Sequence, residues 1–256
     1  MSTRNNWTIE EHIIAFNIYC HIPFGQIDED TPEVQELAKL VGRSVGAASR
    51  KLANFARLDP ALKKRGIKGL THGAKGEEEV WNEFASNPEG LALESERLVA
   101  QRLGKSVEST AEIDTEDLPE AGIEREALVR LRVKQSFFRR RVLSAYCFRC
   151  CVTGLTNLQL LVASHIVPWA EDAFNRLNPK NGLCLNPLHD RAFDRRLMWV
   201  EDGFVVRLSP KLAEAKEDSK KTIDWLMSFD GRPLLLPKYF KPDPDLLARH
   251  AALCHR

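Results

Sequence analysis

Hydrophobic residues at helical spacing dominate the first hundred positions. One such pattern begins after Thr8, whose side chain can cap a helix. Thr31 and Pro32 mark a second start, since threonine caps well and proline is tolerated in the first turn. Apolar spacing then continues to Gly42 and resumes after Ser44. This part of the chain is therefore predicted to contain a helix, a short glycine-containing turn and another helix.

A helix, a short turn and a basic second helix are the layout of a helix-turn-helix module. The second helix is expected to contact DNA through four residues: Arg50, Lys51, Asn54 and Arg57. A turn-rich stretch from Ile67 to Gly73 could add a β wing, as in a winged helix. The competing interpretation is a small helical bundle whose charged residues face water.

The pattern after position 160 changes to short apolar runs. One run closes on His165 and a second opens at Asn181. A helical segment follows, in which Asp190 and Asp194 are four residues apart and share one face. Apolar stretches on both sides of Glu201-Asp202-Gly203 predict a hairpin beyond it. The order strand, loop, strand, helix, together with the helical first half, predicts an α+β protein.

Composition and charge divide the chain further. With 256 residues and 43% hydrophobic content, it can bury two modest cores. Residues 104–122 are polar and acidic with few large apolar groups, as in a linker. We therefore predict a helical module at 1–103, an acidic linker at 104–122 and a second domain at 123–256.

Charged residues occur in blocks along a chain whose net charge is only +1. Positions 43–75 and 130–141 are basic, and the segment between them is mostly acidic. Two basic blocks indicate two surfaces that could meet a polyanion, although solvated helix faces would give the same pattern. No signal peptide and no run of about 20 apolar residues is present. Six cysteines do not make a disulfide framework, so we expect a reduced, cytoplasmic protein without a membrane segment.

One histidine beside two carboxylates suits the hydrolysis of a phosphodiester. The imidazole of His165 titrates near neutrality, so it can take a proton from water as a general base. Asp190 and Asp194 are candidate ligands for one hard divalent cation, with His189 as an alternative ligand. Asn181 is expected to hold the loop between the strands, although its carbonyl could also bind a cation. Each residue alone could be structural: a core histidine, or carboxylates on a solvated helix.

The ordered set of motifs resembles the ββα-metal finger of the HNH endonucleases. Its sequence elements are CCVTG at 150–154, ASHIVPW at 163–169, NGLCL at 181–185 and LHDRAFD at 188–194. Further likeness at 135–139 and 244–250 extends the resemblance to about half of the chain. The resemblance implies a metal-dependent nuclease in which His165 is the general base, and Asn181 is placed with it in the catalytic set.

The chain departs from the wider HNH pattern at two places. Ser164 occupies the position where many members carry a metal-binding aspartate, and serine is a poor ligand. Many members also have a zinc ribbon with two Cys-x-x-Cys pairs. Cys147 and Cys150 could form the first pair, but Asn186 and His189 replace the second. A sparse metal shell is therefore expected, and a structural Zn²⁺ is disfavoured because closed zinc sites need four N or S ligands.

Arg139 and Arg140 directly precede the predicted finger. Guanidinium groups suit bidentate contact with phosphate, so both are candidate DNA-binding residues. Ion pairs with the acidic linker are the alternative.

The combined motifs predict an endonuclease that uses Mg²⁺, or another divalent cation such as Mn²⁺, to hydrolyse double-stranded DNA. Its helical module would read the DNA, with or without modified bases, in restriction or a similar defence. A DNA-binding regulator with a structural, catalytically silent finger is the alternative. Cutting both strands with one site per chain would favour a homodimer.

Overall fold

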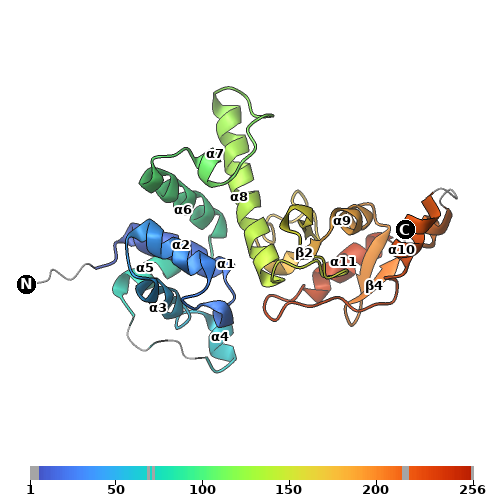
Figure 1. Ribbon diagram of the computed structural model, residues 1–256, viewed down its shortest axis with the longest axis horizontal. Coiled ribbons are helices and arrows are strands. Elements are labelled where there is room, and N and C mark those ends of the chain that lie inside the picture. The colour runs from blue at the N-terminus through green and yellow to red at the C-terminus, as the bar shows by residue number, and fades with distance from the viewer. Residues whose placement is uncertain (1–5, 68–69, 71–72, 215–218, 255–256) are drawn as a thin grey trace, which may run out of the picture. The chain divides into compact units, whose positions relative to one another are not determined.

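Residues 6–67, 70, 73–214 and 219–254 are described by the computed structural model (Figure 1). The chain forms two compact units, Met1–Phe137 and Phe138–Arg256. Their boundary lies inside the long helix α8 (Ile123–Ala145), whereas composition predicted the second domain to begin at 123. Within the described residues, no helix has both the length and the apolar character needed to cross a membrane.

Helices make up the first unit. The predicted cap Thr8 begins α1, whereas Thr31 precedes α2 without a side-chain cap bond, because its hydroxyl donates to the carbonyl of Gln26. Thr8 forms a capping box with Glu11, and Ser44 caps α3 through the amide of Ala47. Gly42 ends α2 in the left-handed conformation, with φ 65°, which costs glycine little. The elements before α8 are α1 (Ile9–His21), η1 (Phe24–Gln26), α2 (Pro32–Val41), α3 (Val45–Phe55), α4 (Pro60–Lys64), α5 (Lys75–Phe84), α6 (Pro88–Leu103) and α7 (Val107–Thr110).

An aromatic cluster holds this unit together around α1, which packs against α2, α3, α5 and α6. Phe16 lies 5.0 Å from Phe55 and 5.2 Å from Trp81 between ring centroids. Tyr19 packs beside them and donates a 2.9 Å hydrogen bond to Asp59, which also caps α4. Large buried rings contribute more to such a core than their number suggests, because each removes a large apolar area from water.

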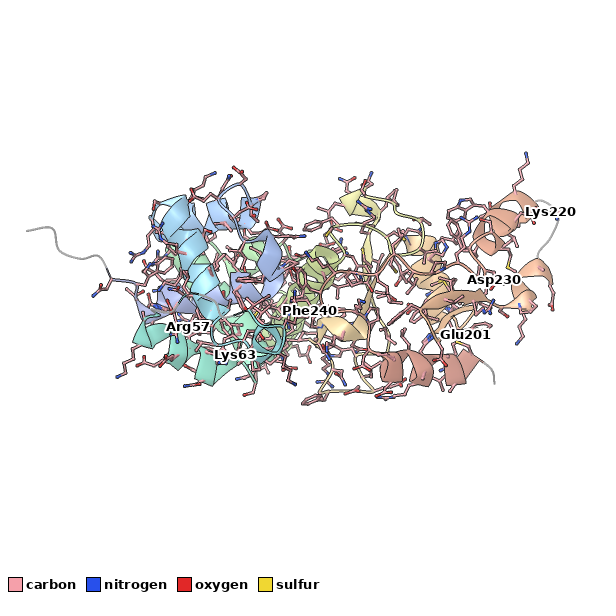
Figure 2. All side chains as sticks on the ribbon, turned by 90° about the horizontal axis from the view of Figure 1, so that it is seen from below. Arg57, Lys63, Glu201, Lys220, Asp230 and Phe240 are labelled. Atoms are coloured by element: carbon pink, nitrogen blue, oxygen red, sulfur yellow. The ribbon has the colours of Figure 1, made fainter. Side chains whose placement is uncertain are left out.

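Three of the four residues expected to contact DNA are bound within the unit. Lys51 is buried and forms an ion pair with the fully buried Glu77 on α5. Asn54 donates a 3.0 Å hydrogen bond to the same carboxylate. Arg57, labelled in Figure 2, pairs with Glu78 at 2.8 Å. A buried carboxylate needs such partners, so these side chains have a structural role and their contact with DNA stays a prediction.

The predicted helix-turn-helix layout is present as α2, the turn after Gly42, and α3. On α3, Arg50 is exposed to solvent. Whether this layout reads DNA stays a prediction. The expected β wing at Ile67–Gly73 includes residues 68–69 and 71–72, which lie outside the described residues.

The acidic segment predicted as a linker has contacts of its own. Ala111 is buried, and Glu108 on α7 forms a 2.8 Å ion pair with Arg125 on α8. Ser136 on α8 also donates a hydrogen bond to the carbonyl of Ala111. Residues 104–122 therefore pack along the first part of α8. The short helix α7 and Ala111 supply the contacts, which could not be inferred from the acidic composition.

Two small antiparallel sheets and their helices form the second unit, as the α+β prediction requires. β1 (Val162–His165) pairs with β2 (Gly182–Leu185), so that His165 lies opposite Gly182. The predicted hairpin joins β3 (Met198–Glu201) to β4 (Val205–Leu208) through Gly203. The remaining elements are η2 (Leu158–Leu160), η3 (Pro179–Asn181), α9 (Pro187–Asp194), η4 (Pro210–Glu214), α10 (Lys220–Met227) and α11 (Pro244–Cys254).

Helix α9 is central to this unit, because it contacts β1, β2 and β3. α11 packs on β3 and is joined to α9 through His250. The ring of His250 stacks on Phe193 with 3.7 Å between centroids and donates a 3.1 Å hydrogen bond to its carbonyl. At the hairpin, Arg207 bonds Glu201 at 2.7 Å, and the Asp230 carboxylate accepts from the amide of Leu208; Glu201 and Asp230 are labelled in Figure 2.

The buried pair in the first unit generates a stability prediction. Lys51→Ala should lower the free energy of unfolding by up to about 3–5 kcal/mol, because Glu77 would remain buried with only Arg57, 3.4 Å away, as a cation. Arg50→Ala is the matched control on the same helix, and it should leave stability within about 0.5 kcal/mol of the parent protein. Urea denaturation measures both. Similar small effects for the two variants would mean that the Lys51–Glu77 pair does not hold the unit together.

Candidate active site

His165 is held at the end of β1 by aromatic rings and one backbone carbonyl. Its ring stacks on Phe138 with 3.7 Å between centroids and an interplanar angle of 11°. Trp169 lies edge-on at 5.7 Å. Nε2 is 2.9 Å from the carbonyl oxygen of Arg176. A carbonyl can only accept, so Nε2 carries the hydrogen and Nδ1 is the basic nitrogen of the neutral ring.

The electrostatic surroundings keep this imidazole neutral near neutral pH. Burial lowers the pKa of His165 below its ordinary value, and it outweighs two groups that raise the pKa, the Arg176 carbonyl and the Asp194 carboxylate. The ring is therefore unprotonated and able to accept a proton at Nδ1. The two opposing groups would favour the imidazolium once a proton arrives.

Asn181 fixes the loop that carries these partners. Its side chain is fully buried. Oδ1 accepts a 2.8 Å hydrogen bond from the amide of Val167, and Nδ2 donates to the carbonyls of Val167 (3.1 Å) and Asn175 (3.2 Å). The backbone carbonyl of Asn181 also accepts from the amide of Ile166. These contacts match the expected positioning role, because both polar groups of the amide are already used within the loop.

Gly182, the next residue, permits a close approach between β2 and the end of α8. A Cβ at this position would lie 2.4 Å from Val142 and 2.9 Å from Phe138. Phe138 is the ring on which His165 stacks. Glycine is therefore required here by space, and the Asn-Gly pair serves both the loop and the stacked histidine.

The loop between β1 and β2 is held in place by hydrogen bonds and an ion pair of its polar side chains. Arg176 donates a 2.8 Å hydrogen bond to the carbonyl of Trp169, and Asp172 accepts from the amide and the side chain of Asn175. Arg249 on α11 pairs with Asp172 at 3.0 Å. Within this ordered loop, Phe174 is 93% exposed. Phe174 could not be recognised from the sequence, since one apolar residue in a polar loop carries no periodic signal.

Asp190 and Asp194 lie on α9, as the i,i+4 spacing predicted. Asn186 caps this helix by accepting from the amides of Leu188 (3.1 Å) and His189 (3.0 Å). Asp190 is half-buried and Asp194 is exposed. The helical geometry required for the two carboxylates to share a face is therefore present.

The environment of Asp190 suits a cation. Burial raises the pKa of its carboxyl, the Ser164 hydroxyl lowers it, the Asp194 charge raises it and Arg191 lowers it. Ser164 Oγ is itself buried and, in the described part of the chain, makes no hydrogen bond of ordinary geometry. Neither Asp190 nor Asp194 forms an ion pair with any described residue. Two neighbouring carboxylates without an ion-pair partner fit a hard divalent cation, which prefers oxygen ligands.

The protein shell around such a cation would be sparse. Among the residues that the structure describes, no three His, Cys, Asp or Glu side chains converge in a way that could hold a metal ion. Asp190 and Asp194 would therefore supply two ligands, with the rest coming from water and substrate oxygens.

His189 makes other contacts. Its buried ring lies 5.4 Å from Trp225 and 5.1 Å from Phe229, both between centroids. Nδ1 is 3.0 Å from Oδ1 of Asn186, and burial lowers the pKa of His189 to about 4. Asn186 and His189, the residues at the second pair of the zinc ribbon, thus bond to each other. The role of His189 as an alternative metal ligand stays a prediction that these contacts do not support.

The cysteines near the finger are mainly packing residues. Cys150, Cys151 and Cys184 are buried, whereas Cys147 is exposed. Burial raises the pKa of Cys184 to about 12 and that of Cys151 well above its ordinary value. Such thiols remain protonated near neutral pH and pack as small apolar groups.

Arg139 holds the segment before β1. Its guanidinium donates to the backbone carbonyls of Leu161 at 2.7 Å and Leu158 at 3.4 Å. The neighbouring Arg140 is exposed. Contact of either residue with DNA stays a prediction, and for Arg139 the backbone contacts already give a structural reason for its presence.

Comparison with known proteins identifies the segment that carries this site. Residues 150–201 match a family model described as HNH endonuclease. The matched segment contains β1, β2 and α9, and with them His165, Asn181, Asp190 and Asp194. A comparison with curated proteins found no match. The resemblance to the HNH endonucleases is confirmed, and the domain supports nuclease activity in general.

The hydrogen bonds of Asn181 generate a second stability prediction. Asn181→Ala should lower the free energy of unfolding by at least about 2 kcal/mol, because it leaves buried groups of Val167 and Asn175 without partners. Glu171→Ala, an exposed change in the same loop, is the control and should have little effect. Thermal and urea denaturation measure both variants. Equal stability of the two would contradict the role given to Asn181.

Proposed function

We propose that this protein is a metal-dependent endonuclease that hydrolyses phosphodiester bonds in double-stranded DNA. One observation carries the proposal: His165, whose free nitrogen is Nδ1, ends strand β1, and β1 packs against helix α9 with its unpaired Asp190 and Asp194. The HNH endonuclease match over 150–201 supports the same reaction class.

In the proposed reaction, Nδ1 of His165 takes a proton from a water molecule as its oxygen attacks the phosphorus. The new P–O bond forms, the bond to the leaving sugar oxygen breaks, and that oxygen takes a proton from solvent water. The proton on His165 then passes to solvent. Nε2 keeps its hydrogen because the Arg176 carbonyl holds it. Asp194 and that carbonyl favour the imidazolium formed in this step.

Asp190 and Asp194 would hold the divalent cation, Mg²⁺ or Mn²⁺. When bound, the cation supplies charge neutralisation on the phosphate and on the leaving oxygen. Ser164 lies beside Asp190 and would orient this carboxylate. With only two protein carboxylates, the affinity for metal should be weak without DNA and stronger with it, since phosphate oxygens complete the shell.

The helical first unit would contribute DNA binding, with α2 and α3 as the reading helices and Arg50 as the exposed cation of α3. Lys51, Asn54 and Arg57 also bond Glu77 and Glu78 on α5, and their contact with DNA stays a prediction. A nuclease domain joined to a separate helical unit suits restriction or a similar defence.

Plasmid cleavage tests the proposal. Purified full-length protein is incubated with supercoiled DNA, unmodified or base-methylated, in Mg²⁺, Mn²⁺ or EDTA. Nicked or linear DNA should appear with either cation and be absent with EDTA. A regulator with a silent finger would instead bind the DNA and leave it supercoiled in every condition, which would overturn the proposal. Linear product without nicked intermediate would point to a homodimer.

Loss of the base should abolish cleavage without loss of binding. We expect His165→Ala to lower the cleavage rate by about 100-fold or more, the usual contribution of a general base. DNA affinity and circular dichroism should stay near those of the parent protein, and Glu171→Ala serves as the active control. In the parent enzyme, cleavage should fall as pH drops through a pKa below 6.5, because protonation removes the free nitrogen. Cleavage at the parent rate by a folded His165→Ala protein would contradict the assignment.

The carboxylates predict a metal-dependent phenotype. Asp194→Asn should raise the Mg²⁺ concentration needed for half-maximal cleavage by about 10-fold or more, with a smaller change in the maximal rate, since it weakens a ligand and leaves the base. Asp202→Asn, an exposed change in the β3–β4 hairpin, is the control. Titration of Mg²⁺ against initial rate measures both variants. An unchanged titration curve for Asp194→Asn would place the ion elsewhere.

A further inference from the structure

Helix α9 ends in a conformation that ordinarily requires glycine. Arg196 has a φ of 61°, in the left-handed region. Its amide bonds the carbonyl of Phe193 at 2.9 Å, and the amide of Leu197 bonds that of Ala192 at 2.8 Å. These two bonds define a Schellman motif with Arg196 at the position where glycine avoids the strain of a Cβ.

Other helices of this chain end in the same motif. α2 and α6 use Gly42 and Gly104, with φ of 65° and 62°. α8 uses Cys147, with φ of 53°, so a non-glycine residue can be accommodated. The strained backbone of Arg196 does not by itself indicate a function, because Cys147 adopts the same conformation.

The arginine side chains at the end of α9 give a separate indication of function, through their exposure and their lack of partners within the described part of the chain. Arg191, Arg195 and Arg196 are all exposed. None of them forms an ion pair or a side-chain hydrogen bond with any residue that the structure describes. Each offers five N–H donors in a planar fork, so three sets of strong donors are left for an outside ligand.

Five other arginines of this unit are used within the fold. Arg139, Arg141 and Arg176 donate to backbone carbonyls at 2.7–3.0 Å. Arg207 and Arg249 bond carboxylates at 2.7 and 3.0 Å. The contrast is marked because Asp190 and Asp194 lie on the same helix as the unpaired arginines and remain unpaired themselves.

The positions of these arginines relate them to the candidate active site. Arg191 directly follows Asp190, and Arg195 directly follows Asp194. Arg195 follows Arg191 by four residues, so the two share a face of the helix end. Arg196 lies near α11: burial is the main cause that lowers the pKa of His250 there, and the charge of Arg196 adds to it. The helix dipole favours cations at this end, but it accounts for only a weak interaction and needs no residue in the left-handed region.

We propose that Arg191, Arg195 and Arg196 bind backbone phosphates of DNA beside the scissile phosphate. Arginine forks match phosphate oxygens in a bidentate manner, and the carboxylates of the same helix would hold the cation between them. Arg196 accepts a strained backbone because its guanidinium binds the nucleic acid. The inference deepens the proposed nuclease function and rests on it.

One substitution separates binding from stability. Arg196→Gly should raise the melting temperature by a few degrees, because glycine relieves the left-handed strain. The same change should weaken binding of a 25-base-pair duplex in EDTA by about 5–10-fold, and reduce the slope of log affinity against log salt by about one. Arg196→Lys should retain the charge and recover part of the affinity. Fluorescence anisotropy and thermal denaturation of the full chain measure these quantities.

Matched changes complete the test. Arg191→Gln and Arg195→Gln should weaken DNA binding without raising the melting temperature. Arg149→Gln removes the same charge from an exposed site after α8, and its affinity should change less than twofold. An equal loss in Arg149→Gln would mean general charge attraction and overturn the inference. So would undiminished affinity in Arg196→Gly, or a lower melting temperature in that variant. If the parent protein neither binds nor cleaves DNA, the proposed function itself fails.

Discussion

The buried amide of Asn181 is the constraint on which the candidate site depends. It bonds Val167 at the start of the β1–β2 loop and Asn175 in its middle, so it ties both to the residue that directly precedes β2. Arg176, the residue after Asn175, supplies the carbonyl that fixes the tautomer of His165. The orientation of the proposed base is therefore set by an amide that need not touch the substrate, because the loop in between is held by short hydrogen bonds throughout.

The charged side chains around Glu77 in the first unit are paired, whereas those of α9 in the second unit form no ion pair within the part of the chain that the structure describes. In the first unit, the buried Glu77 forms an ion pair with Lys51 and accepts a hydrogen bond from Asn54. Those side chains stabilise the helices and are removed from solvent. On α9, carboxylates and guanidinium groups occur side by side without pairing among the described residues. Unpaired charges gain little from the fold itself, and such a surface is compatible with the ion and phosphate binding proposed above.

Local chemistry allowed much of the fold to be predicted. Thr8, Ser44 and Gly42 act on atoms within a few residues of themselves, so helix starts and ends could be inferred from the sequence. The same holds for the turn at Gly203 and for the shared face of Asp190 and Asp194. The order of motifs also indicated the nuclease family, because strand, loop, strand and helix must follow one another in the chain to bring these residues together.

Partners distant in the chain could be decided only by the tertiary structure. Lys51 reads as an exposed helix cation until α5 brings Glu77 beside it, 26 residues away. The pKa of His165 falls because Phe138 and the loop bury its ring. The spacing of residues in the sequence could not predict this burial. Arg139 reads as an unpaired guanidinium until packing brings the carbonyl of Leu161 to accept from it, and its contact with DNA stays a prediction. Sequence determined which groups were present and which local elements they form; packing decided which of those groups remain free, since burial and pairing depend on residues far apart in the chain.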